Sequence, residues 1–172
     1  MRILVLLASA FVCALGAAAD GTLLVVNRNG GSVSLIDLPT TTEIARLPVG
    51  PVIPHELATS RDGRWAVTGE YGTRERPGRH LVVIDIEAAS IRSRIDLGFD
   101  SRPHSVVFLR DSRHVITTME LSEAIALVDV IDGEVVRSWP TGGVDSHMVR
   151  LAPDERRAYV AARGGGTLSV IW

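Results

Sequence analysis

Three histidines recur at matching places along the chain. His55, His104 and His147 lie 49 and 43 residues apart, and an aspartate follows each of them by seven residues. A neutral imidazole offers a nitrogen lone pair, so histidines that converge on one place can bind Cu or Zn or hydrogen-bond an anionic ligand. The alternative is that each histidine orders the start of its own strand by bonding to neighbouring backbone groups. Both roles are open at this point.

Two arginines also hold equivalent places near the ends of the chain. Arg28 and Arg163 lie 135 residues apart, each next to a glycine-rich segment. A guanidinium can bind a carboxylate or a phosphate through two parallel hydrogen bonds. A pair of solvated hairpin arms is the simpler interpretation. Glu56 and Met148 directly follow two of the histidines, and we expect them to pack between sheets because adjacent strand residues point to opposite faces.

Most catalytic motifs are missing. The chain has no lysine, so a phosphate-loop lysine and a Schiff-base lysine are excluded, and it contains neither G-x-S-x-G nor H-E-x-x-H. The sequence requires no cofactor, and we favour a binding protein over an enzyme. Aspartates at six repeated positions are expected to bond to the backbone of turns: Asp37, Asp62, Asp85, Asp111, Asp129 and Asp154.

The composition fits one exported domain. The 172 residues are 46% apolar and carry a net charge of −2, which allows a real core and argues against nucleic acid as a partner. Residues 1–19 combine a basic start, an apolar stretch and small residues before Asp20, which predicts a signal peptide cleaved near Ala19. We therefore expect a periplasmic or secreted protein with no membrane span after cleavage. Cys13, the only cysteine, would be lost with the signal.

The elements that must position these residues follow a repeat of about 45 residues. Apolar runs around Asp37, Asp85 and Asp129 keep the same rhythm as the histidines. Residues 55–97 predict four short strands, at 55–59, 64–69, 81–86 and 91–97, from apolar runs, alternation and turn signals. Four strands in such a unit are typical of a β-propeller blade. The sequence thus predicts an all-β domain over residues 20–172.

Several segments carry a resemblance to a known family. Residues 32–37 read SVSLID, residues 44–50 read IARLPVG, and a proline–histidine pair precedes the turn at residues 60–63, which reads SRDG. This pattern resembles the YVTN-type (YncE-like) β-propeller repeat family. The resemblance covers nearly all of residues 21–172 and implies a propeller fold. Ser112 and Glu155 depart from it, because they replace the glycine of the turn.

Strand counting predicts an incomplete ring. The blade units fall roughly at residues 21–49, 55–97, 104–139 and 147–172, which amounts to about three and a half four-stranded blades. Closed propellers have typically 4–8 blades, and closure protects sheet edges. We therefore expect further blades missing from the C-terminal side, self-association of two copies, an open arc that stands alone, or a separate partner chain that completes the ring.

Three functions compete on this basis. The first is an exported scaffold that binds a protein or a small-molecule ligand without turnover. The second is a metal- or redox-linked periplasmic propeller in which His55, His104 and His147 line the channel, as the resemblance to histidine-lined propellers of nitrous oxide reductase and haem d1 proteins implies. The third is a lactonase-like propeller hydrolase, which the resemblance allows but no residue pattern demands.

Overall fold

The computed structural model describes residues 20–50 and 53–172, so the predicted signal peptide at residues 1–19 lies outside the described part. The described chain is almost entirely β-structure, and its helical content is the short 3-10 turn η1 at Arg28–Gly30. Within these two ranges, no helix is long and apolar enough to cross a membrane. The predicted all-β fold class is confirmed.

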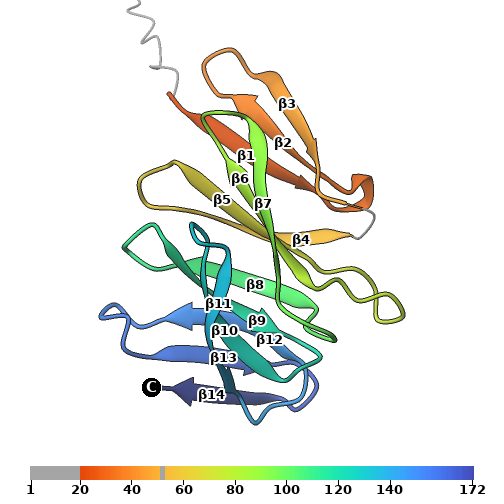
Figure 1. Ribbon diagram of the computed structural model, residues 1–172, viewed down its shortest axis with the longest axis vertical. Coiled ribbons are helices and arrows are strands. Elements are labelled where there is room, and N and C mark those ends of the chain that lie inside the picture. The colour runs from red at the N-terminus through yellow and green to blue at the C-terminus, as the bar shows by residue number, and fades with distance from the viewer. Residues whose placement is uncertain (1–19, 51–52) are drawn as a thin grey trace, which may run out of the picture.

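The strands form four antiparallel sheets that follow one another along the long axis of the molecule (Figure 1). The first sheet comprises β1 (Thr22–Asn27), β2 (Ser32–Asp37) and β3 (Thr42–Pro48). The second comprises β4 (Pro54–Thr59), β5 (Trp65–Glu70), β6 (His80–Asp85) and β7 (Ser90–Asp96). The third comprises β8 (Pro103–Phe108), β9 (His114–Met119), β10 (Ala124–Asp129) and β11 (Glu134–Pro140). The fourth comprises β12 (Ser146–Leu151), β13 (Ala158–Ala162) and β14 (Thr167–Ile171).

These sheets are the blades of a partial β-propeller. Each is an up-and-down arrangement of consecutive strands, as the repeat predicts. Two sheets have four strands and two have three, so the predicted three and a half blades are spread over four sheets. By alignment of the repeats, the first sheet holds the second to fourth strands of a blade and the last sheet holds the first to third.

The core lies between neighbouring sheets. Strand β6 is buried on both faces, and its alternate side chains pack against different neighbouring sheets. Val82 and Ile84 pack toward Val33 of the first sheet, whereas Val83 packs toward Val115 of the third. Side chains that alternate across a strand thus fill two separate interfaces. This is why a run of β-branched and aliphatic residues, rather than strict alternation, marks the middle strand of a blade.

The turn aspartates behave as the sequence predicts. The carboxylates of Asp62, Asp111 and Asp154 each accept a hydrogen bond from the backbone N–H two residues later. Asp37, Asp85 and Asp129 accept backbone N–H groups from the turns that follow their strands. These carboxylates stabilise turns, which accounts for their repetition without a catalytic role.

The first strand of each of the last three sheets, β4, β8 and β12, is the innermost strand of its blade. Each of these strands carries a bulge beside its repeated histidine. In the second sheet Pro54 pairs with Glu70 and Leu57 pairs with Thr68, so two residues of β4 face the single residue Gly69. Register shifts occur at the same place between β8 and β9 and between β12 and β13. A bulge interrupts the alternation of a strand and redirects the side chains within it.

Gly69 provides a stability test of this arrangement. A Cβ at Gly69 would lie 2.6 Å from the carbonyl oxygen of Pro103, which belongs to the next sheet. We expect Gly69→Ala to lower the free energy of unfolding by about 1–3 kcal/mol, because rigid backbone must move to admit the methyl group. Urea unfolding followed by circular dichroism measures the change. Gly30→Ala is the control, since its nearest contacts are ordinary ones, and equal stability of the two variants would contradict the expectation.

Candidate functional site

The three repeated histidines are brought together on the innermost strands β4, β8 and β12. The ring centroids of His55 and His104 lie 4.5 Å apart, and those of His104 and His147 lie 3.7 Å apart. The rings are tilted by 40° and 31°, so they form a loose stack. Tyr71 closes one side of the stack, with its ring centroid 5.1 Å from His55 and 4.9 Å from His104. The three repeated histidines therefore form one continuous stack across β4, β8 and β12, called the histidine column below.

His104 occupies the centre of this column and has a fixed tautomer. Its Nδ1 lies 3.1 Å from the carbonyl oxygen of His147, an acceptor, so Nδ1 carries the proton and donates it. Thr118 Oγ1 donates to the same carbonyl at 3.0 Å. This contact is the backbone role that the sequence offered as an alternative for the histidines. It also leaves Nε2 of His104 with a free lone pair.

Burial keeps His104 neutral. Desolvation lowers the pKa of His104 to about 3, and the charges of His147 and His55 act in the same direction. Desolvation likewise lowers the pKa of His55, followed in effect by the positive charge of Arg28. At neutral pH these two imidazoles thus offer lone pairs rather than positive charge.

A buried charge cluster anchors the other end of the column. The Glu120 carboxylate is fully buried, and one of its oxygens lies 3.0 Å from Nδ1 of His147 and 2.9 Å from Nη2 of Arg163. Its other oxygen accepts a hydrogen bond from Nη1 of Arg102 at 2.6 Å. Arg102, itself buried, also stacks its guanidinium 3.9 Å from the Tyr71 ring centroid. Sequence reasoning missed Arg102, because nothing in its spacing marks it.

The two predicted arginines have different surroundings. Arg163 is half exposed and contacts Glu120 and, at 3.7 Å, Asp145. Its guanidinium thus pairs with the buried Glu120 carboxylate, while about half of the side chain remains in solvent. Arg28 lies in η1 and is exposed, near enough to His55 to influence its pKa. Of the five predicted site residues, the three histidines lie on the innermost strands, whereas Arg28 and Arg163 lie in the turns that follow β1 and β13. Their ligand-binding role remains a prediction.

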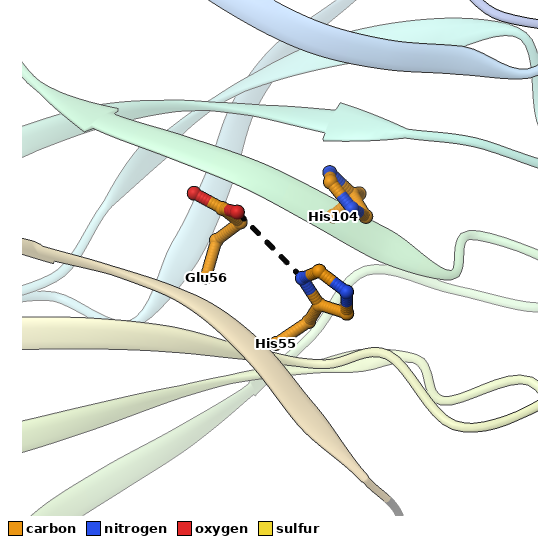
Figure 2. A group of neighbouring side chains, drawn as sticks. All are labelled: His55, Glu56 and His104. Atoms are coloured by element: carbon orange, nitrogen blue, oxygen red, sulfur yellow. Dashed lines mark ion pairs between the residues drawn. The ribbon is translucent and has the colours of Figure 1, made fainter. Parts of the chain in front are cut away.

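Glu56 does not point to the face opposite His55, where regular strand alternation would place it (Figure 2). Because of the bulge in β4, its carboxylate lies on the same side as the His55 ring, with Oε1 3.6 Å from Nδ1 (Figure 2). Figure 2 shows His104 facing the same space from β8. One donor atom from each of His55, Glu56 and His104 lies within 4.8 Å of the others. Alternation in a regular strand would have separated His55 from Glu56.

A groove of about 360 Å³ runs along the same innermost strands. Its lining includes Glu56 from β4, Val106 from β8, and three arginines that sequence reasoning did not single out: Arg61, Arg110 and Arg150. A signal for two of them is present in the sequence, since Arg61 and Arg110 each follow a repeated histidine by six residues. A second hollow, of about 150 Å³, lies between the third and fourth sheets and is mainly apolar.

Comparison with known proteins bears on the fold alone. No protein-family model matches the chain, and no curated protein matches its sequence. A solved structure described as "Kuenenia stuttgartiensis Hydrazine Synthase" superposes with a TM-score of 0.75 at 22% sequence identity, over 87% of this chain and 42% of that one. The present chain therefore spans less than half the length of that protein chain. The similarity supports a β-propeller-type fold.

Proposed function

We propose that this chain is an exported β-propeller scaffold of the YVTN type that binds a small anionic ligand, of the carboxylate or phosphate class, on its innermost strands. The observation that carries the proposal is the groove lined by Arg61, Arg110 and Arg150. Export rests on the signal-like residues 1–19, and the family rests on the repeated segments of the sequence.

The arrangement of the arginines suits an anion. Each comes from a different innermost strand or the turn after it, so a ligand in the groove would touch three blades at once. The main chain holds two of them in place, since Arg110 donates to the carbonyl of Pro153 and Arg150 donates to that of Val149 at 2.8 Å. A guanidinium held in this way loses less side-chain freedom when it binds a carboxylate.

The side chains that line the groove carry a net positive charge, with three arginines against one glutamate. Glu56 is the acidic side chain in its lining, and Arg110 has Glu155 at 3.9 Å. An anion with two or more carboxylates matches three guanidinium groups better than a single charge does.

Citrate is a suitable probe of this site. We expect metal-free protein to bind citrate in isothermal titration, and Arg150→Gln to weaken the affinity at least fivefold because one charged contact is lost. Arg137→Gln is the matched control, since Arg137 lies on the outermost strand β11 over Trp139. Loss of the same size in both variants, or no binding by the wild-type protein, would count against the proposal. Binding should also weaken as salt rises.

A second candidate function, the metal-linked propeller, is favoured by one specific observation. It is the proximity of donor atoms from His55, Glu56 and His104. The anion site rests on the three arginines of the groove and the metal site on His55, Glu56 and His104, so each can be tested with its own variants.

A further inference from the structure

The bulge in β4 creates a group of metal donors that the three-histidine repeat does not contain. His55 and Glu56 come from β4 and His104 from β8, so two adjacent blades contribute (Figure 2). The corresponding neighbours of the other histidines are Ser105 and Met148, neither of which supplies a carboxylate. The group therefore occurs at one junction between blades and is not a property of the repeat.

We propose that His55, Glu56 and His104 bind one divalent transition-metal ion, with Zn²⁺ as the reference ion, through two imidazole nitrogens and one carboxylate oxygen. Two nitrogens and one oxygen suit Zn²⁺ and its neighbours in the first transition series, whereas Ca²⁺ and Mg²⁺ prefer oxygen ligands alone. Three protein ligands leave at least one coordination position for water or a small ligand.

An unpartnered nitrogen supports this assignment independently of the cluster. Nδ1 of His55 is buried and has no hydrogen-bond partner, with the nearest carboxylate oxygen of Glu56 at 3.6 Å. A buried polar atom without a partner is costly, and a metal ion between these two atoms would satisfy both. The donors lie up to 4.8 Å apart. Ligand atoms bound at about 2.1 Å in a tetrahedron are roughly 3.4 Å apart, so the most distant donors must approach each other by about 1.4 Å, which side-chain rotation can provide.

His104 is prepared as a ligand by its surroundings. Its Nδ1–H is bonded to the His147 carbonyl, which is the usual outer-shell arrangement of metal-binding histidines and directs the lone pair to Nε2. Thr118 Oγ1 donates to that carbonyl as well and so helps to hold it in place.

The local charges make Glu56 the decisive ligand. Arg28 lies near His55, and its positive charge opposes that of the incoming metal ion. The Glu56 carboxylate supplies the compensating negative charge. His147 has a different role, because its ring stacks on His104 and its Nδ1 is bonded to Glu120.

Isothermal titration with ZnCl₂ in citrate-free buffer tests the donor set. We expect one equivalent of Zn²⁺ per wild-type chain, and at least tenfold weaker binding by Glu56→Gln and by His104→Asn. His147→Asn retains the backbone carbonyl and an amide donor toward Glu120, so its affinity should stay within threefold of the wild type. Co²⁺ added in place of Zn²⁺ should give visible absorption bands that Glu56→Gln loses.

The opposite pattern would overturn this site. If His147→Asn abolishes binding while Glu56→Gln retains it, the donor set is the three-histidine one and the present assignment fails. His114→Ala controls for binding at the exposed pair of His114 with Asp111, and loss of the single equivalent in that variant would also reject the assignment. Glu56 is partly exposed, so Glu56→Gln should fold normally, which circular dichroism verifies. Failure of citrate binding leaves the metal result unaffected, because the two titrations use separate probes and variants.

Discussion

Replacing Glu120 with glutamine is expected to lower the free energy of unfolding by about 3–5 kcal/mol, the typical loss when one partner of a buried ion pair is removed. Glu120 is fully buried, and its carboxylate oxygens accept from Arg102 and pair with Arg163 and His147. The variant leaves the buried Arg102 guanidinium without a negative partner. The loss should therefore come from an uncompensated charge rather than from one missing hydrogen bond.

Chemical denaturation of wild-type and variant protein at pH 7.5 measures this effect. Glu43→Gln is the matched control, because the pair of Glu43 with Arg46 is solvent-exposed, and we expect that variant to match the wild type within error. A double variant that also carries Arg102→Met should recover a substantial part of the loss, since both buried charges of the pair are then removed. A loss below about 1 kcal/mol for Glu120→Gln would mean that the cluster is solvated in solution.

His104 should make the protein less stable in mild acid. The pKa of His104 is about 3 in the folded protein against a model value of 6.5, so between these values the unfolded chain binds a proton that the folded chain does not. Stability contributed by the neutral imidazole is thus fully present above about pH 6.5 and is lost as the pH falls toward 3. One pH unit in this window is worth about 1.4 kcal/mol, which gives on the order of 2–3 kcal/mol between pH 7.5 and pH 4.5.

The variant His104→Asn isolates this contribution. Asparagine cannot titrate in this range, and its amide can donate to the His147 carbonyl in place of Nδ1. Its free energy of unfolding should fall less than that of the wild type between pH 7.5 and pH 4.5, by about 2–3 kcal/mol. Parallel curves for the two proteins would show that His104 is hydrated and titrates normally. The comparison stops at pH 4.5 because carboxylates with lowered pKa values, such as those of Asp62 and Asp96, titrate at lower pH.

The Gly69→Ala variant tests the close contact between the second and third sheets, whereas the two variants above test buried polar groups at the junction of the third and fourth sheets. Glu120 and His104 lie at the interface between the third and fourth sheets, where β8 and β9 lie beside β12. Polar groups buried at such a junction fix the relative placement of the blades only when each has a partner. The histidine column therefore contributes to architecture whether or not it also binds a ligand.

The sequence by itself determined the four-stranded blade unit and which residues lie on its strands and turns. Short-range chemistry is sufficient for this, because turn aspartates such as Asp62 bond to backbone two residues away and apolar runs such as residues 81–84 recur at intervals of about 45 residues. The repeat also placed His55, His104 and His147 at equivalent strand positions, and equivalent positions on successive blades face one another.

The tertiary structure alone decided which side chains meet at those positions. A bulge of one residue in β4 turned Glu56 toward His55, against the expected alternation, because the pairing of β4 with β5 sets the register there. Arg102 and Glu120 are 18 residues apart and became partners because the pairing of β8 with β9 brings their backbones together, and packing between sheets then buries both. Periodicity in sequence assigns residues to strands and faces. Donor distances, burial and charge compensation depend instead on packing between blades, which the sequence encodes only through the whole fold.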